Sequence, residues 1–147
     1  MTIKVVNTPE NNAQAPIVIG AIADWHHARN LIEGATTWTQ SKKYLEEFLE
    51  LVAAQMPEHT PEVIAGQVHK WIEDLLVAGR IKTVKVENAK AALHDAIGDM
   101  GVVGINISER EGSTYTQDLQ GSYREIEHRT GRMVDGCFVK DEDLNDE

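Results

Sequence analysis

The hydrophobic pattern of this chain has the period of α-helices. Between residues 21 and 131, apolar side chains recur every three to four positions, the spacing that gives a helix one packed face. Five helices are expected, over residues 21–33, 37–56, 61–79, 87–110 and from 114 to about 131. Their short connections favour an all-α fold, a helical bundle of about five helices.

Three of these helices begin with specific start signals. In two of them a threonine is followed three residues later by glutamine, the spacing of a capping box, and in the third a threonine precedes a proline at the first helical position. The residues are Thr37 with Gln40, Thr114 with Gln117, and Thr60 with Pro61. Gly34 is expected to end the first helix in the left-handed conformation, and Pro57 to end the second. Arg80–Val86 alternates apolar and charged residues, which favours an extended connector.

The two ends of the chain differ from its helical middle. Residues 1–20 are expected to form an arm, because Ile3–Val6 suits a short strand and Asn7–Pro16 is rich in turn-forming residues. Near the other end, Asp135-Gly136 lies between two apolar runs, the strongest short-range signal for a β-hairpin. Three parts are therefore expected: an arm (1–20), a helical domain (21–131), and a hairpin with an acidic tail (132–147).

Composition and charge narrow the possible functions. The 147 residues carry a net charge of -10 and are 41% hydrophobic, without an apolar run long enough to span a membrane. Such an acidic chain is unsuited to DNA or RNA polymers, whose binding rests on Lys and Arg contacts to phosphate, although divalent cations would let it bind a single nucleotide. A single cysteine, Cys137, and an N-terminus unlike a signal peptide favour the cytoplasm.

Two of the expected helices carry matched rows of polar residues. At about 100° per residue, the members of each row fall on one side of their helix. The rows are Glu46, Glu47 and Glu50 beside Lys43 on the second helix, and Asp95, Asp99 and Asn106 on the fourth. We call Glu46, Glu47 and Glu50 the glutamate cluster, and Asp95, Asp99 and Asn106 the aspartate ridge.

Carboxylates in this arrangement suit a hard cation. Mg²⁺ takes oxygen ligands, usually one or two carboxylates together with waters and substrate phosphates. If the two rows face each other across a bundle, the cation would bridge phosphate oxygens and a carboxylate-oriented water would attack phosphorus. The competing interpretation is a solvated acidic face, the usual state of charged side chains. Gly98, Gly101 and Gly104 indicate a close approach to the fourth helix, by a packing partner or by a ligand.

Three segments, in this order, resemble the MazG-like nucleoside triphosphate pyrophosphohydrolases. They are Arg29–Ala35 with Lys43–Leu51, then His94–Asn106, then Tyr123–Lys140. The glutamate cluster reproduces the family's Glu-Glu-x-x-Glu signature, and the second and third segments look like the branch of the family common in phages. The resemblance extends over roughly residues 25–144.

The resemblance implies an all-α enzyme that hydrolyses a (d)NTP to (d)NMP and pyrophosphate with Mg²⁺ or Mn²⁺, and that assembles as a dimer or tetramer. It implies Glu47, Glu50 and Asp99 as metal ligands, and Glu46 as a residue that either supports those ligands from behind or orients the attacking water. Such an enzyme would act in nucleotide-pool control or housecleaning.

This sequence departs from the family at two places. The Glu of the family's Glu-x-x-Asp signature falls on Ala96, which cannot bind metal, so Asp95 is expected to take that role on the same ridge as Asp99. The helix at 61–79 is inserted between the two acidic motifs. It could form a lid, alter base selectivity or extend the subunit interface. Its apolar stripe more often means packing than function.

Four further residues are candidates for substrate binding. Trp38 would stack on a base or pack at the start of its helix. Lys43 would contact a phosphate or neutralise Glu47. Asn106 would bind the substrate or tie its helix to a neighbouring one. Arg132 would contact a phosphate of the substrate or serve as ordinary surface charge. The alternative to an enzyme is a non-catalytic nucleotide-sensing or helical interaction protein that kept the scaffold after losing the ligand at Ala96.

Overall fold

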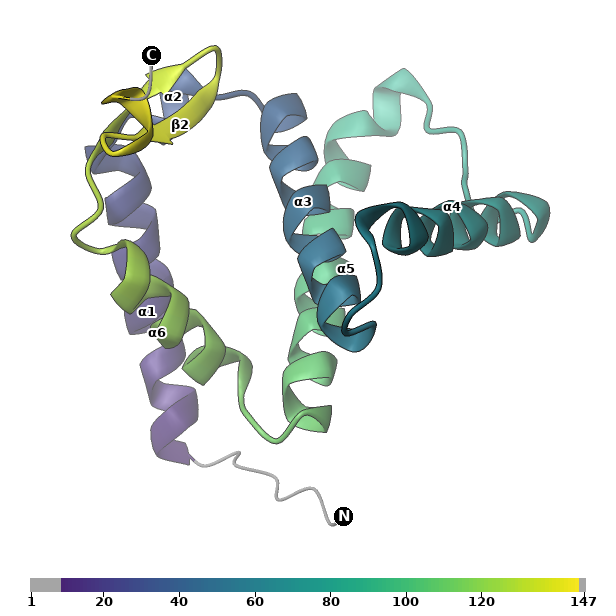
Figure 1. The fold of residues 1–147 in the computed structure, drawn as a ribbon, viewed down its shortest axis with the longest axis horizontal. Coiled ribbons are helices and arrows are strands. Elements are labelled where there is room, and N and C mark those ends of the chain that lie inside the picture. Colours follow the sequence, from purple (N-terminus) through teal and green to yellow (C-terminus); the bar gives the residue numbers. More distant parts are fainter. Residues whose placement is uncertain (1–8, 146–147) are drawn as a thin grey trace. The chain divides into compact units, whose positions relative to one another are not determined.

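The computed structural model describes residues 9–145. In this part of the chain the helices are α1 (Pro9–Ala28), α2 (Leu31–Gly34), α3 (Thr37–Gln55), α4 (Pro61–Val77), α5 (Ala89–Arg110) and α6 (Tyr115–Ile126), with the 3-10 turns η1 (Val86–Asn88) and η2 (Asp143–Asn145) and the strands β1 (Gly131–Val134) and β2 (Cys137–Lys140) (Figure 1). The expected all-α fold with a C-terminal hairpin is confirmed. The elements form two compact units: unit 2 is Thr36–Asn88, and unit 1 combines the chain before it with the chain after it.

The arm expected over residues 1–20 is helical from Pro9 onward, so that prediction is wrong for the described residues. Pro9 stands at the first helical position, where its missing N–H does no harm, but Pro16 lies inside α1 and removes a backbone hydrogen bond. Packing offsets this loss, because α1 lies along α6 and buries Val18 and Trp25. The strand expected at Ile3–Val6 lies outside the described residues.

The helix expected over residues 21–33 is divided at Asn30. This residue has a φ of 58°, a left-handed conformation that asparagine tolerates better than most residues, and α2 begins directly after it. Gly34 does not adopt the left-handed conformation expected of it and is instead the last residue of α2. A Cβ at Gly34 would lie 2.8 Å from Cγ of Met133, so glycine here allows the hairpin to approach α2.

Unit 2 consists mainly of α3 packed against α4. Val52 and Val68 are its buried apolar residues, 2% and 8% exposed, and the rings of Phe48 and Trp71 lie 6.4 Å apart between centroids. The inserted helix expected at 61–79 therefore forms the packing surface for α3. It ends at Val77, two residues earlier than expected.

The helix caps of unit 2 follow threonine chemistry. At the start of α4, Thr60 accepts from the backbone N–H of Val63, with Pro61 at the first helical position, as the sequence predicts. The cap of α3 is shifted by one residue from its prediction: Thr36 is the N-cap, and it pairs reciprocally with Thr39. A threonine hydroxyl can reach back to the cap as the expected glutamine would. The connector over residues 80–85 contains no strand in the described chain.

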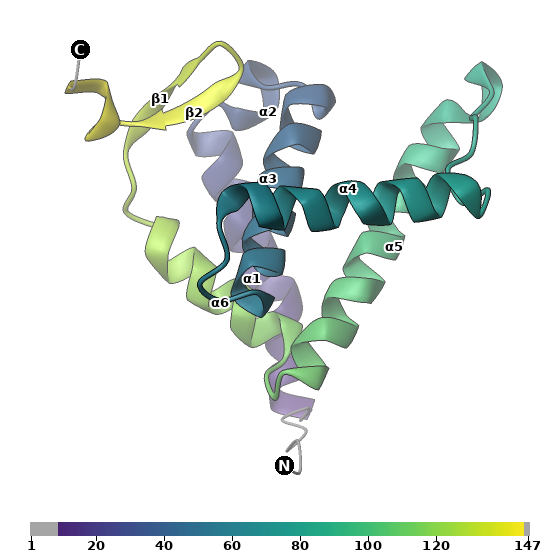
Figure 2. The same cartoon turned by 45° about the vertical axis from the view of Figure 1, so that its right-hand side comes forward.

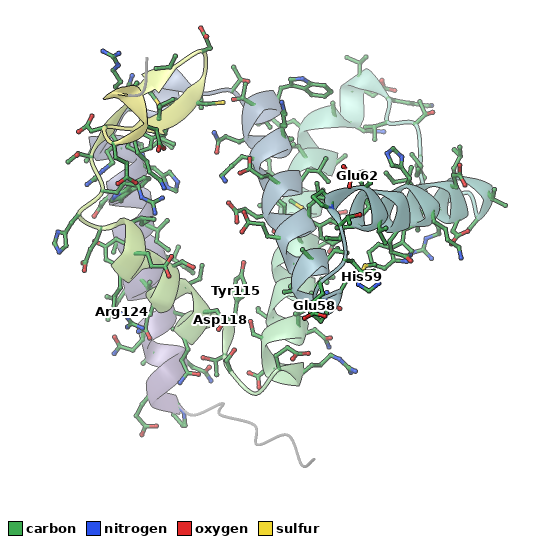
Figure 3. The ribbon with its side chains drawn as sticks, viewed as in Figure 1. Glu58, His59, Glu62, Tyr115, Asp118 and Arg124 are labelled. Atoms are coloured by element: carbon green, nitrogen blue, oxygen red, sulfur yellow. The ribbon has the colours of Figure 1, made fainter. Side chains whose placement is uncertain are left out.

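In unit 1, a polar network fixes the corner between α5 and α6. The buried Ser108 hydroxyl donates to Asp118 at 2.5 Å, and Ser113 donates to both oxygens of the same carboxylate at 2.9 and 2.8 Å. The predicted capping box of Thr114 and Gln117 is confirmed. Figure 3 labels Asp118 near the start of α6. Asp118 is itself exposed, but its carboxylate accepts from two hydroxyls at the corner, so this network is structural.

The three glycines of α5 have different environments. A Cβ at Gly104 would lie 3.0 Å from the ring of Tyr115, so here the close approach expected from the sequence is a packing contact with α6. Apart from the backbone of α5 itself, no atom in the described part of unit 1 lies within 4 Å of a Cβ placed at Gly98 or Gly101. The sequence pattern therefore predicted one contact correctly, and that contact is with protein.

The C-terminal hairpin forms as Asp135-Gly136 predicts. Strands β1 and β2 are antiparallel, with Val134 opposite Cys137, and the two turn residues have φ values of 50° and 79°. Positive φ at both central residues is the signature of the type I′ turn, whose twist matches that of the strands. The hairpin lies beside α2 in both views (Figure 2).

Trp25 and Arg29, at the end of α1, join the hairpin and α6 to α1. The indole Nε1 of Trp25 donates to the carbonyl of Ile126 at 2.8 Å, and its ring meets Phe138 edge-on with centroids 5.6 Å apart. The Arg29 guanidinium lies 4.6 Å from the Trp25 ring centroid and donates to the carbonyls of Glu127 and Arg129. These carbonyls follow the last turn of α6, where backbone acceptors lack helical partners. Trp25, in α1, and Arg29, directly after α1, therefore cap α6.

Most large apolar side chains of the described residues remain exposed. In unit 2 these include Trp71, Ile72, Leu75 and Leu76, and in unit 1 Ile97, Val102, Val103 and Ile105, all more than 40% exposed. Faces of this kind normally mark interaction surfaces. The helices of the described chain include none with the length and apolar character needed to cross a membrane.

Candidate metal centre

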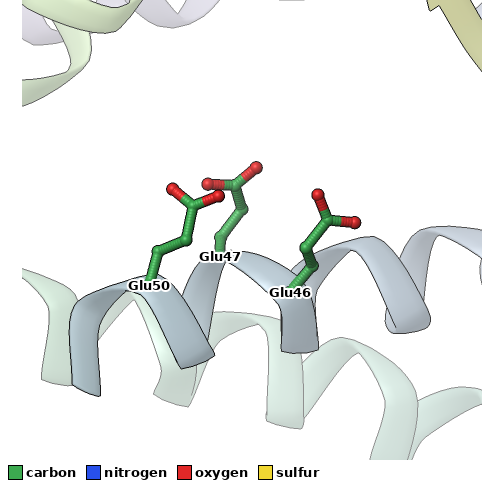
Figure 4. A group of neighbouring side chains, drawn as sticks. All are labelled: Glu46, Glu47 and Glu50. Carbon is green, nitrogen blue, oxygen red and sulfur yellow. The ribbon is translucent and has the colours of Figure 1, made fainter. Parts of the chain in front are cut away.

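The glutamate cluster lies on the exposed side of α3, in unit 2. Glu46, Glu47 and Glu50 follow a helical spacing of one and three residues, and their carboxylates project to the same side of the helix (Figure 4). One ligand oxygen from each can be chosen so that all lie within 4.8 Å of one another. Among the described residues this is the one group of three or more His, Cys, Asp or Glu side chains with that property.

Lys43 lies one turn before the cluster and is paired with two of its members. The Nζ atom lies 2.6 Å from Oε1 of Glu47 and 2.9 Å from Oε1 of Glu46. The Glu47 carboxylate, and after it that of Glu46, raise the pKa of Lys43 above its ordinary value of 10.5, so this ammonium stays charged at neutral pH. Of the two roles considered for Lys43, neutralising the cluster is the one that this geometry displays.

The residues of the cluster fit a hard divalent cation. All three donors are carboxylate oxygens, the ligand type that Mg²⁺ and Mn²⁺ prefer. The carboxylates are exposed, which leaves room for the waters and phosphate oxygens that complete an octahedral shell. The cluster also holds a positive charge already, the ammonium of Lys43. Each of Glu46, Glu47 and Glu50 offers a carboxylate oxygen that could hold the metal.

The aspartate ridge lies on α5, which belongs to unit 1. The helix is continuous from Ala89 to Arg110, so Asp95, Asp99 and Asn106 lie on one side of it, as the sequence predicts. All three are exposed. The structure thus brings together the three glutamates within one unit and aligns the three ridge residues along one helix of the other.

Trp38 stands in the first turn of α3 and is 86% exposed. The Trp38 indole is not covered by other parts of the described chain, so no packing contact within one copy is seen for it. Its open face leaves base stacking as the role to test, and the residue lies about two helical turns before Glu46.

Arg132 lies on β1, opposite Val139, and is exposed. It forms no ion pair within the described chain. A nearby open hollow of about 560 Å³ lies where the hairpin returns past the end of α6. Its lining is Glu125, His128, Arg129, Thr130, Lys140, Asp141 and Glu142. Acidic and basic side chains are mixed in it, so its charge favours no anion.

Sequence reasoning missed two features of unit 1. The hollow was missed because the Asp135-Gly136 signal predicts a turn but not the side of α6 past which the chain returns. The pairing of Trp25 and Arg29 with the end of α6 spans about a hundred residues of sequence, and no local pattern signals it. Comparison of the chain with protein-family models, with curated proteins and with solved structures gives no match.

Proposed function

We propose that this protein is a Mg²⁺-dependent nucleoside triphosphate pyrophosphohydrolase, which converts a (d)NTP and water into (d)NMP and pyrophosphate. The observation that carries the proposal is the glutamate cluster, with three exposed carboxylates whose ligand atoms lie within 4.8 Å. The same residues resemble the Glu-Glu-x-x-Glu signature of MazG-like enzymes, and this resemblance is the reason for proposing that reaction. Mn²⁺, with the same ligand preference, would replace Mg²⁺.

In the proposed reaction, Glu47 and Glu50 of unit 2 would hold the metal. For Asp99, and for Asp95 in place of the Glu missing at Ala96, the role of a metal ligand stays the one that the family resemblance implies. When bound, the metal would neutralise charge on the triphosphate and make a nearby water a better nucleophile. Glu46 orients the attacking water and accepts its proton. The water oxygen bonds to the α-phosphorus, the bond to the bridging oxygen breaks, and pyrophosphate leaves with the electron pair.

Substrate contacts are proposed for four residues outside the carboxylates. Trp38 stacks on the base, which its 86% exposure permits. Lys43 and Arg132 contact phosphates, and Asn106 binds the sugar or base through its amide. We propose that the reaction takes place in the cytoplasm, on free nucleotides rather than on nucleic-acid polymers, as the net charge of -10 favours.

A nucleotide panel tests this function. The purified full chain is incubated with Mg²⁺ and each common NTP and dNTP, and the products are separated. The expected products are NMP and pyrophosphate in equal amounts, from at least one nucleotide. Release of inorganic phosphate would place the attack on another phosphorus. Absence of turnover with every nucleotide, combined with a rise in Tm on adding Mg²⁺ and a non-hydrolysable dNTP, would favour the nucleotide-sensing alternative instead.

We further propose that a second copy of this chain covers the exposed apolar faces, giving a homodimer or homotetramer. In unit 2, Ile72, Leu75 and Leu76 are 47%, 46% and 63% exposed, although they belong to the apolar stripe of α4. Light scattering after size-exclusion chromatography should give a mass at least twice the chain's 16.3 kDa. Leu75→Glu should shift the mass toward the monomer, because a charge cannot be buried unpaired in such an interface. A monomeric mass for the unaltered protein would contradict the proposal.

A further inference from the structure

The glutamate cluster holds a cation supplied by its own helix. The ammonium of Lys43 bridges Glu46 and Glu47, with N–O distances of 2.9 and 2.6 Å. The spacing explains why: residues three and four positions apart are neighbours on a helix, so one lysine reaches both carboxylates. Without this positive charge, the neighbouring carboxylates would face only one another and solvent.

A divalent cation and this ammonium need the same oxygens. The two carboxylates that Lys43 engages belong to the three-membered group whose ligand atoms lie within 4.8 Å. A cation bound between them would meet the ammonium at close range, where like charges repel. The side chain of Lys43 is 51% exposed, so it is free to swing into solvent. Exposed ion pairs are individually weak, so the ammonium lowers the affinity of the cluster for metal without blocking it.

We propose that Lys43 is a built-in competitor of the divalent cation, whose ammonium must leave Glu46 and Glu47 before the cation binds. Lys43 thereby sets the concentration of free cation at which the cluster fills. This inference rests on the proposed function, because it takes the glutamate cluster as the metal site.

Metal binding measured by calorimetry tests the competition without using activity. Mn²⁺ alone is titrated into the full-length protein, its Lys43→Met and Lys43→Arg variants, and the Lys42→Met variant. Methionine keeps the unbranched stem and the helix propensity of lysine but removes the charge. Lys43→Met should lower the Kd for Mn²⁺ by about three- to tenfold, the range expected from releasing two exposed ion pairs. Lys43→Arg, which keeps the charge, should stay within about twofold of the unaltered protein.

Lys42→Met is the matched control. Lys42 is adjacent on α3, and among the described residues it forms no ion pair, so its removal changes the net charge equally without freeing a carboxylate. Its Kd should change by less than about twofold, since exposed charges that make no contact are screened. Equal tightening by Lys42→Met and Lys43→Met, or no tightening by Lys43→Met, would overturn the competition.

The same titration separates this inference from the proposed function. Glu47→Gln should weaken Mn²⁺ binding, which would show that the measured heat comes from Mn²⁺ bound at the glutamate cluster. If the unaltered protein binds Mn²⁺ and Lys43→Met leaves the Kd unchanged, only the role of Lys43 is lost. If neither the unaltered protein nor Lys43→Met binds Mn²⁺, the proposal of a metal site at the glutamate cluster is contradicted, and so is the proposed competition.

Discussion

Glu47→Gln and Glu50→Gln should each lower kcat/KM for the best nucleotide substrate by at least about 100-fold, because the bound metal supplies several kcal/mol of transition-state stabilisation. Glutamine keeps the size of glutamate and one carbonyl oxygen, but it removes the negative charge that holds the cation. Both side chains are exposed, so the substitutions should leave the fold intact. The measurement is steady-state pyrophosphate release at fixed Mg²⁺, with far-UV circular dichroism to check the helices.

Glu73→Gln provides the matched control. Glu73 is an exposed glutamate on α4 in the same unit, away from the cluster in sequence, and the same substitution there should change kcat/KM by less than about twofold. Raising Mg²⁺ should restore part of the rate in Glu50→Gln if the loss comes from weaker metal binding. Unchanged turnover in both Glu47→Gln and Glu50→Gln would mean that the cluster is a solvated acidic face.

The contribution of unit 1 to the reaction is tested by Asp95→Asn in the same assay. The substitution should lower kcat/KM at least about tenfold if Asp95 replaces the Glu missing at Ala96, since carboxylates that support a metal typically contribute ten- to a hundredfold. Glu87→Gln, on η1, is a carboxylate of the other unit and should leave the rate unchanged. If Asp95→Asn has the same rate as the unaltered protein, Asp95 is not a metal ligand.

Local chemistry made part of the fold predictable. The Thr60-Pro61 start, the Thr114/Gln117 capping box and the Asp135-Gly136 turn each act within four residues, and all are present in the structure. Packing across long sequence separations is what sequence reasoning could not supply. The Asn- and Pro-rich segment from Pro9 to Pro16 has turn composition, but its helix is held by contact with α6, which follows about a hundred residues later.

The candidate site was also predictable from local sequence only in part. The glutamate cluster was predictable because three carboxylates on one helix need only helical spacing to meet. The pairing of Lys43 with Glu47 was predictable as one of two alternatives, because the i,i+4 spacing permits the ion pair but does not require it. The exposure of Trp38 was not predictable, because an aromatic residue at a helix start fits either a packed or an open position.

Two of the segments that carry the family resemblance contact each other within unit 1. Arg29, in the first segment, donates to carbonyls at Glu127 and Arg129, in the last. Residues of those segments are therefore explained by packing: they join α1, the end of α6 and the hairpin. The chemistry of the proposed reaction rests instead on the acidic residues of α3 and α5. Variants in the two groups should differ accordingly, one group affecting stability and the other turnover.

Trp25→Ala should lower the free energy of unfolding by about 3–5 kcal/mol, the range for removing a large buried aromatic side chain. Trp25 is 8% exposed, and its loss removes the contact with Phe138, the hydrogen bond to Ile126 and the ring beneath Arg29. The Arg29 guanidinium would then lose its cover while still facing the end of α6. Urea unfolding followed by far-UV circular dichroism, at one protomer concentration, measures the change independently of tryptophan fluorescence.

Two companion variants separate the components of this effect. Trp25→Phe keeps a ring against Phe138 but removes one of two donors to the Ile126 carbonyl, which still accepts from the Arg129 N–H, so it should cost about 0.5–1.5 kcal/mol. Trp38→Ala removes the same atoms as Trp25→Ala from a side chain that is 86% exposed, and it should change the free energy of unfolding by less than about 0.5 kcal/mol. Equal losses in Trp25→Ala and Trp38→Ala would contradict the role of Trp25 in joining α1 to α6. A difference of several kcal/mol, with base-dependent turnover altered only in Trp38→Ala, would assign one indole to the fold and the other to the substrate.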